Sequence, residues 1–160
     1  MKVKVTPSKV HGNVKIPASK SMAHRALICA SLSDGTSIVS NVTNSKDIEA
    51  TVGCMKALGA KIKQIDETTY EVTGTNLFKQ EGNITCNANE SGSTLRFLIP
   101  LAACTNAKVK FLGQGRLLQR PMDVYENEFK EQNIEFNQSD KEIIVSGNLQ
   151  AKDYVVQGDI

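Results

Sequence analysis

Apolar residues recur in the first half of the chain with the spacings of alternating helices and strands. Ile48, Val52 and Met55 fall at positions i, i+4 and i+7, which is the spacing of one buried helix face. Segments rich in β-branched residues and bounded by polar turns predict strands around this helix. In chain order we expect a strand at 14–18, a helix from about 21 to 32, a strand at 36–42, the helix through Ile48 and Met55, and a closing hairpin of strands 60–65 and 70–74.

The second half of the chain repeats this order of elements. Its expected parts are a strand at 83–88, a helix from about 93, a strand at 107–113, a helix from about 122, and a hairpin of strands 134–137 and 142–147. Three pairs of matched positions have nearly the same separation: Arg25 and Arg96 are 71 residues apart, Lys56 and Lys130 are 74, and Gly74 and Gly147 are 73. A repeated period of this kind indicates duplication of one structural unit.

The repeat predicts an α/β fold of βαβαββ units with mixed sheets, because a strand-helix-strand crossover pairs its strands in parallel and a hairpin pairs them antiparallel. We divide the chain into an N-terminal strand or hinge segment at 1–12, a first unit at 13–81, a second unit at 82–152, and the start of a third at 153–160. The third is expected because YVVQ, from Tyr154, resembles the opening strands of the other two. We therefore expect the chain to be part of a longer protein.

Composition and charge argue against several classes of partner. The 160 residues are 40% hydrophobic and 22% charged, with a net charge of +2. The basic residues are scattered and only 5% of residues are aromatic, so we expect no nucleic-acid partner. No apolar run approaches the roughly 20 residues of a membrane span, and the N-terminus has no apolar core of a secretory signal. We expect no membrane partner and a cytoplasmic location.

The cysteines favour a reducing compartment. Cys29, Cys54, Cys86 and Cys104 are widely spaced and stand mostly within apolar stretches, so we interpret them as buried thiols. A disulfide between two of them stays open as an alternative. The chain has no CxxC pair and only two histidines, so we expect neither a metal nor a cofactor.

Small hydroxyl residues mark the start of the first helix in each unit. The segments are ASKSMAHR (18–25) and ESGSTLR (90–96). Free N–H groups and the dipole at a helix N-terminus attract anions, and Arg25 and Arg96 follow a serine by four and three residues on the same helix face. The alternative is that the serines only cap helices and that the arginines are solvated. Recurrence of the pattern in two units favours anion sites.

A third basic element lies in the loop FLGQGRLLQRPMD, where Arg116 and Arg120 precede Pro121, a residue suited to the opening of a helix. An ordinary exposed loop is the alternative. Gly113 and Gly115 resemble part of a dinucleotide-binding fingerprint, but the third glycine is missing and no helix is expected to begin there.

The motifs SKSMAHR (19–25), SGSTLR (91–96) and RLLQRP (116–121), in this order, closely resemble those of the 5-enolpyruvylshikimate-3-phosphate synthase family. The resemblance covers essentially the whole chain. It implies two domains of three βαβαββ units each, with substrates bound in the cleft between them, so that this chain holds two complete units of the first domain. Family members are about two and a half times longer than this chain.

The resemblance also implies an activity. The family transfers the enolpyruvyl group of phosphoenolpyruvate to the 5-hydroxyl of shikimate 3-phosphate and releases phosphate, through a tetrahedral intermediate and without a metal. This transferase step belongs to the shikimate pathway, which leads to chorismate and the aromatic amino acids. We expect the full-length enzyme to be monomeric and the fragment to be inactive alone. Self-association of the fragment through an unpaired strand is a further hypothesis.

Site residues follow from the resemblance position by position. Lys20, Ser21 and Arg25 would bind shikimate 3-phosphate, and Lys20, Gly92 and Arg120 would bind phosphoenolpyruvate. Lys20 would also be catalytic, because an ammonium can balance charge during addition and elimination. Gly92 would let the backbone approach the phosphate without a Cβ in the way. Further candidates are Asp47, Glu90, Ser93 and Arg96.

The chain departs from the family pattern at several positions. Many members have Asn, Ala, Gly and Thr where this chain has Glu90 to Ser93, and a carboxylate at Glu90 would repel an anion unless it pairs with a cation. Pro100 cannot donate to the Arg96 carbonyl, which predicts a kink or an early 3₁₀ turn. Histidine has an unperturbed pKa that suits a general base, but His24 stands beside Arg25, which argues against a catalytic role. We interpret His11 as a hinge or surface residue. The groups that transfer protons are expected in the second domain.

Two alternatives remain. UDP-N-acetylglucosamine enolpyruvyl transferases share the fold and the phosphoenolpyruvate donor with the family that this chain resembles. In those enzymes an Asn usually follows the lysine, and a reactive Cys precedes the arginine. Here Ser21 follows Lys20, and the segment before Arg120 has no Cys. A free-standing anion-binding scaffold without chemistry would explain the helix starts but not the beginning of a third unit.

Overall fold

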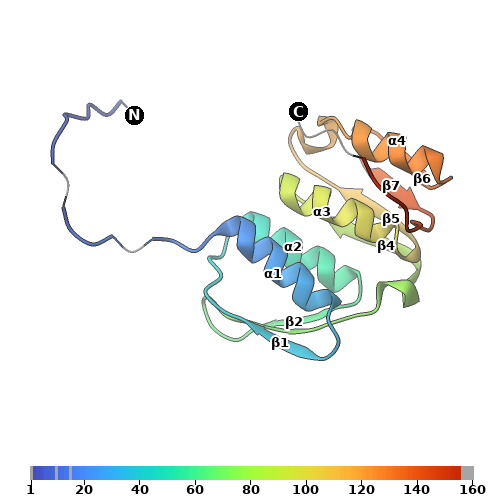
Figure 1. Cartoon of the computed structure of the whole chain (residues 1–160), viewed down its shortest axis with the longest axis horizontal. Helices are drawn as coiled ribbons and strands as arrows, with labels where there is room; N and C mark the ends of the chain where they lie inside the picture. Colours follow the sequence, from blue (N-terminus) through green and yellow to red (C-terminus); the bar gives the residue numbers. More distant parts are fainter. Residues whose placement is uncertain (1, 10, 15, 156–160) are drawn as a thin grey trace.

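The computed structural model describes residues 2–9, 11–14 and 16–155, and it contains two sheets that are each covered by helices (Figure 1). The first half comprises α1 (Lys20–Leu32), β1 (Thr36–Val39), α2 (Lys46–Ala57), β2 (Lys61–Gln64) and β3 (Tyr70–Thr73). The second half comprises β4 (Glu81–Asn87), α3 (Gly92–Ala102), β5 (Asn106–Leu112), α4 (Asp123–Glu131), β6 (Glu135–Gln138) and β7 (Ile143–Ser146). Short 3₁₀ helices, η1 (Leu77–Lys79) and η2 (Leu117–Gln119), lie in the connections.

The predicted α/β architecture is confirmed, and the two sheets match strand for strand except at one edge. The first sheet has the order β1-β3-β2 with antiparallel pairs. The second has the order β4-β5-β7-β6, in which β4 and β5 are parallel and the other pairs are antiparallel. Strand β5 corresponds to β1, and the β6–β7 hairpin corresponds to the β2–β3 hairpin. Mixed sheets were predicted for both units: the second sheet is mixed, whereas the described strands of the first are all antiparallel.

The predicted opening strand at 14–18 is wrong for the described residues. Val14 is 85% exposed and Ile16 is 82% exposed, and neither lies in a strand. Figure 1 shows this segment running away from the folded body. A β-branched sequence becomes a strand only when another backbone pairs with it, and no strand within the described ranges pairs with this segment. The predicted start at 153–160 has no strand at 153–155, and 156–160 lie outside the described residues.

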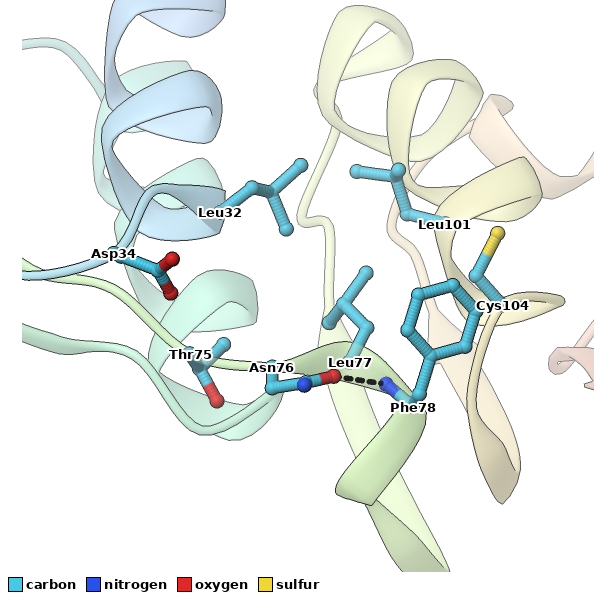
Figure 2. Close-up of a pocket in the computed structure, with 8 residues that line it drawn as sticks. All are labelled: Leu32, Asp34, Thr75, Asn76, Leu77, Phe78, Leu101 and Cys104. Atoms are coloured by element: carbon cyan, nitrogen blue, oxygen red, sulfur yellow. Dashed lines mark hydrogen bonds between the residues drawn. The ribbon is translucent and has the colours of Figure 1, made fainter.

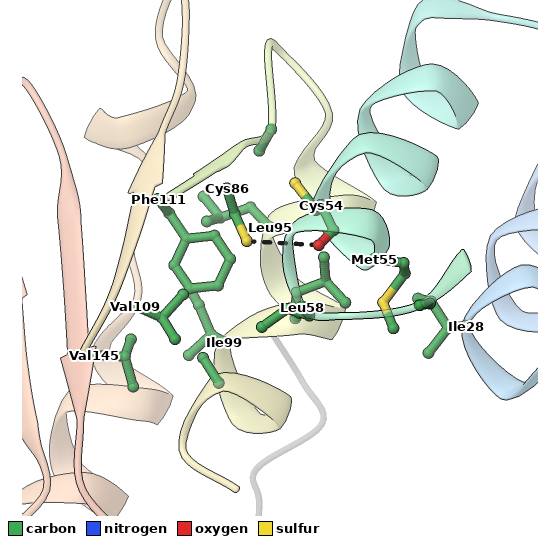
Figure 3. Close-up of a cluster of buried hydrophobic side chains, with 14 of the residues drawn as sticks. Ile28, Cys54, Met55, Leu58, Cys86, Leu95, Ile99, Val109, Phe111 and Val145 are labelled. Carbon is green, nitrogen blue, oxygen red and sulfur yellow. Dashed lines mark hydrogen bonds between the residues drawn. The ribbon is translucent and has the colours of Figure 1, made fainter. Parts of the chain in front are cut away.

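One continuous core joins the two halves, and α2 is at its centre. Met55 and Leu58, at the end of α2, are fully buried together with Leu95 of α3 and Phe111 of β5 (Figure 3). Removing a side chain of this size from water contributes about 1.5–3 kcal/mol. The helices α1, α2 and α3 therefore pack as one layer, with their N-terminal turns held in a fixed relation.

The cysteine prediction is right for the core and wrong for one residue. Cys54 and Cys86 are buried, Cys104 is partly buried, and all four thiols are free. The Cys86 thiol donates to the Cys54 carbonyl at 3.8 Å, and contact with Cys86 and burial raise the pKa of the Cys54 thiol. Cys29 is exposed because it points away from the core, while its helix neighbours Ile28 and Ala30 point into it.

Helix α3 continues through Pro100 to Ala102, so the early 3₁₀ turn, one of the two predicted outcomes, does not occur. Pro100 nevertheless leaves the carbonyl of Arg96 without its usual intrahelical donor. The Tyr125 hydroxyl, from α4, donates to this carbonyl at 2.9 Å, and burial raises the pKa of Tyr125. A tertiary hydrogen bond thus replaces the one that the proline removes.

No helix in the described ranges combines the length and the hydropathy that a membrane crossing requires, and α1 has only 13 residues.

Replacement of Tyr125 tests this compensation. Tyr125→Phe is expected to lower the free energy of unfolding by about 1 kcal/mol, because the Arg96 carbonyl loses its donor. In a Pro100→Ala background the cost should fall to near zero, since residue 100 then supplies an N–H. Urea denaturation of the four proteins completes the cycle. Tyr154→Phe, which removes a donor to the Gln150 carbonyl, is the control and should cost the same in both backgrounds.

Candidate functional site

Two helix N-termini approach each other through an ion pair. Ser19 caps α1, since its side chain accepts from the Met22 N–H at 3.3 Å. Lys20, the first residue of α1, places its ammonium 2.5 Å from a carboxylate oxygen of Asp47 in the first turn of α2. Both side chains are partly exposed, so the pair adds little stability. Its effect is to hold an ammonium group at a defined place.

The first turn of α3 borders a cavity of about 430 Å³ beside this pair. Ser91 caps α3 and accepts from the Thr94 N–H at 3.2 Å. The cavity brings together residues from α2, from the start of α3 and from the loop after η2, and its lining consists of Asp47, Glu90, Gly92, Ser93, Arg96, Phe97 and Arg120. Six predicted site residues therefore meet in one cavity.

Arg120 is held by a loop and faces Gly92. The Gln138 side chain donates to the Leu118 carbonyl at 2.6 Å and to the Arg120 carbonyl at 2.9 Å, which ties this loop to β6. A Cβ at Gly92 would overlap a guanidinium nitrogen of Arg120. The sequence predicted that Gly92 makes room for a phosphate. In the structure, the space that a Cβ at Gly92 would need is also taken by the Arg120 guanidinium.

Arg25 lies next to the cavity and is oriented by two contacts. Its guanidinium donates to the Ser21 carbonyl at 2.9 Å and lies over the Phe97 ring, 4.7 Å from the ring centre. A cation over an aromatic face is attracted by the electron-rich ring. The Ser21 side chain is exposed and does not line the cavity. Phe97, which the sequence did not single out as a site residue, thus links Arg25 to the site.

The charge of the site is positive despite two carboxylates. Lys20 neutralises Asp47, and three arginines, Arg25, Arg96 and Arg120, lie in or beside the cavity. Glu90 is exposed and takes part in none of the ion pairs within the described ranges. Its carboxylate lies against the Cα of Gly115, where a Cβ would come within 2.5 Å of it. This placement does not meet the predicted condition that Glu90 pairs with a cation.

A second cavity, of about 340 Å³, opens at the opposite ends of α1 and α3 (Figure 2). Leu32, Leu77, Phe78 and Leu101 give it mainly apolar walls, and Asp34 is its charged residue. It offers no cation to an anion. Among the described residues, no group of three or more His, Cys, Asp and Glu side chains is arranged to hold a metal ion.

A chain of buried polar side chains runs behind the site. The His24 ring nitrogen Nδ1 is 2.7 Å from the Thr51 hydroxyl, and that hydroxyl is 2.7 Å from Thr94. The Thr94 hydroxyl lies 2.7 Å from Ser91 and 3.3 Å from the Asp47 carbonyl. This network joins α1, α2 and α3, and sequence reasoning missed it because its members belong to separate motifs.

His24 is poorly placed to be a base. It is 1% exposed and does not line the cavity, whereas His11 is exposed, as predicted for a surface residue. Burial is the main cause that lowers the pKa of His24 from its ordinary 6.5, Lys20 and Arg25 lower it further, and Asp47 opposes them. The imidazole is thus kept neutral inside the protein.

Comparison with known proteins identifies the family. A family model described as EPSP synthase (3-phosphoshikimate 1-carboxyvinyltransferase) matches residues 4–160. The chain belongs to the EPSP synthase family. The predicted resemblance is thereby confirmed, and the SKSMAHR, SGSTLR and RLLQRP motifs are those of a member of this family.

Relatives in clostridia match over almost the whole chain. The 3-phosphoshikimate 1-carboxyvinyltransferase of Clostridium perfringens (strain SM101 / Type A) is 45% identical over 161 residues, which cover 99% of this chain and 38% of that protein. The enzyme of the same name from Clostridioides difficile (strain 630) is 43% identical over 171 residues, with 99% and 38% covered. The chain therefore spans about two fifths of the length of these relatives.

A solved structure supports the fold. EPSP synthase from Acinetobacter baumannii superposes with a TM-score of 0.76 at 18% identity, over 89% of this chain and 33% of that chain. At this identity the match shows the α/β fold with mixed sheets and leaves the roles of single residues to other evidence.

The buried histidine predicts how stability changes with pH. Because the pKa of His24 is lowered in the folded chain, the unfolded chain binds the extra proton first as the pH falls below about 6.5. The free energy of unfolding should therefore decrease from about pH 7 to about pH 5, by at most about 1.4 kcal/mol per pH unit from this residue.

Urea denaturation at several pH values measures this decrease. His24→Asn, which cannot titrate, should flatten the pH dependence in this window, whereas His11→Asn at the exposed site should leave it in place. Equal slopes in the parent chain and in His24→Asn would contradict the assignment.

Proposed function

We propose that this chain forms one side of the active site of a 3-phosphoshikimate 1-carboxyvinyltransferase. In the proposed reaction, the 5-hydroxyl of shikimate 3-phosphate loses its proton and its oxygen bonds to C2 of phosphoenolpyruvate, while C3 gains a proton and the C2–C3 double bond becomes single. Phosphate then leaves C2 and C3 loses a proton, which restores the double bond. The observation that carries the proposal is the meeting of Gly92, Arg96 and Arg120 with the Lys20–Asp47 pair in a family member.

The charges of the cavity suit phosphoenolpyruvate. This substrate carries a tetrahedral phosphate and a planar carboxylate. A guanidinium can bind either oxyanion through two parallel hydrogen bonds. Arg120 and the α3 N-terminus at Gly92 are assigned to it, with Arg96 and Ser93 beside them. The dipole of α3 adds to the attraction, since its N-terminal turn faces the same cavity.

Shikimate 3-phosphate is assigned to the neighbouring start of α1. Lys20, Ser21 and Arg25 lie on the first turns of this helix, and the Phe97 ring holds Arg25 next to the phosphoenolpyruvate side. Lys20 stands between the two assigned places, so its ammonium can offset the negative charge that develops when phosphate departs. Asp47 fixes that ammonium and is assigned a positioning role.

The two alternatives find less support. The family match and the names of the relatives favour shikimate 3-phosphate over UDP-N-acetylglucosamine as the acceptor. A scaffold without chemistry would not require Lys20 to be fixed by a carboxylate within an anion site. The proposed enzyme uses small-molecule substrates without a metal, in the cytoplasm.

Arg120 provides a direct test of the phosphoenolpyruvate site. Arg120→Gln should weaken phosphoenolpyruvate binding by about tenfold or more, because a two-pronged charged contact is lost. Arg116→Gln is the matched control, since Arg116 is exposed in the same loop and lies outside the cavity lining. Isothermal titration of the chain and its variants measures both affinities. Equal losses in the two variants would count against the assignment and indicate a nonspecific charge effect.

Gly92 provides a second test that keeps all charges. Gly92→Ala should lower the affinity for phosphoenolpyruvate severalfold, because the new Cβ displaces the Arg120 guanidinium. Gly53→Ala is the control, since a Cβ at Gly53, in α2, meets no atom within 4 Å. It should leave the affinity unchanged and raise the free energy of unfolding by about 0.5–1 kcal/mol. An unchanged affinity in Gly92→Ala would show that the position of Arg120 is immaterial.

A further inference from the structure

The buried chain of polar side chains is more extensive than a capping motif requires. His24 is 1% exposed, Thr51 and Thr94 are 0% exposed, and Ser91 is 2% exposed. Three contacts of 2.7 Å connect them in this order across α1, α2 and α3. Hydroxyl groups in a core are costly unless each finds a partner, so their alignment restricts how the three helices can shift.

The donor direction along the chain can be inferred from the ends. Each threonine hydroxyl has one proton, and the Asp47 carbonyl near Thr94 can only accept. If His24 donates from Nδ1, Thr51 donates to Thr94, and Thr94 donates to Ser91 or to Asp47. The reverse direction would put a proton on His24 Nε2, a buried nitrogen that has no partner among the described residues. A buried N–H without an acceptor is rare in proteins, so the first direction is favoured.

The far end of this chain coincides with the anion cavity. Ser91 also caps α3, whose next two residues, Gly92 and Ser93, line the cavity. Thr94 reaches the backbone of Asp47, whose carboxylate holds Lys20. The polar chain therefore connects His24 to both sides of the cavity.

We propose that His24 is a positioning residue of the anion cavity, which orders the Thr51 and Thr94 hydroxyls and thereby holds the first turn of α3 against the Lys20–Asp47 pair. His24 itself stays outside the cavity, so its role is indirect. The charged groups that act on the imidazole are Asp47, Lys20 and Arg25. The choice of phosphoenolpyruvate as the ligand rests on the proposed function.

The first measurement needs no ligand. Nitrogen-15 NMR of the chain at pH 7 should show His24 protonated at Nδ1 and bare at Nε2. In His24→Leu and in Thr51→Val, the backbone amide signals of Gly92 and Ser93 should shift, because the cap at Ser91 loses its ordered partner. A proton on Nε2, or unchanged amide signals in both variants, would overturn the proposal.

The second measurement is the affinity for phosphoenolpyruvate by isothermal titration. His24→Leu and Thr51→Val should each weaken phosphoenolpyruvate binding about tenfold. Each variant loses one buried hydrogen bond, and the first turn of α3 is then held less firmly in the geometry that binds the ligand. His24→Asn should bind within about twofold of the parent chain, because the Asn amide can donate from nearly the place of Nδ1. Failure of this rescue would overturn the assignment of Nδ1 as the donor.

A matched control separates positioning from stability. Thr105 is 2% exposed, and its hydroxyl donates to the Ala102 carbonyl at 2.7 Å, at the other end of α3. Thr105→Val should destabilise the fold to a similar extent and leave the affinity unchanged. An equal loss of affinity in Thr105→Val would overturn the proposal. If His24→Leu fails to fold, the nearly isosteric Thr51→Val decides.

The two proposals can fail separately. If the parent chain does not bind phosphoenolpyruvate, the ligand assignment fails, and the Gly92 and Ser93 amide signals still decide whether His24 positions α3. If the parent chain binds and the Thr51→Val variant binds equally well, the proposed function stands and the positioning role fails.

Discussion

Buried hydroxyl groups must find hydrogen-bond partners, and this requirement constrains the arrangement of the three central helices. Apolar packing around Met55, Leu58 and Leu95 supplies most of the cohesion, but it is nondirectional and tolerates small rotations. The 2.7 Å contacts of Thr51 are directional and do not tolerate them. The core therefore brings the helices together, and the polar chain sets their register. Because Ser91 and Thr94 stand at the start of α3 and Thr94 reaches the Asp47 carbonyl at the start of α2, this register also positions the charged groups in front of these helices.

Much of the fold could be predicted because most of its helices and strands follow from the local spacing of apolar and polar residues. Helix α2 follows from the spacing of Ile48, Val52 and Met55, and the hairpins follow from short β-branched segments around polar turns. The segment 14–18 has the same local signal and forms no strand among its described residues. Pairing depends on a neighbouring backbone, which the local sequence does not contain. The prediction that Cys29 is buried was wrong for a related reason. An apolar stretch does not indicate which residue of a helix faces outward.

The candidate site was predictable as a list of residues but not as an arrangement. Motifs pointed to Gly92, Arg96 and Arg120, and the structure places them around one cavity. The role of Phe97 under Arg25 joins residues 72 positions apart, and the partner of Thr51 is 43 positions away. Such contacts arise from the packing of separate helices and leave no periodic trace in the sequence. The free carbonyl of Arg96 could be foreseen from Pro100, whereas its partner Tyr125 could not.

The closeness of Gly92 and Arg120 also bears on how such a site can change over time. The guanidinium occupies the space that a side chain at position 92 would need. The two positions therefore cannot vary independently. A larger residue at 92 is compatible only with a shorter or differently directed side chain at 120, so in sequences that share this geometry the two positions should covary. Evolutionary change at this corner of the cavity must then proceed by paired replacements. A protein with only the substitution at position 92 would be an intermediate in which the Arg120 guanidinium is displaced.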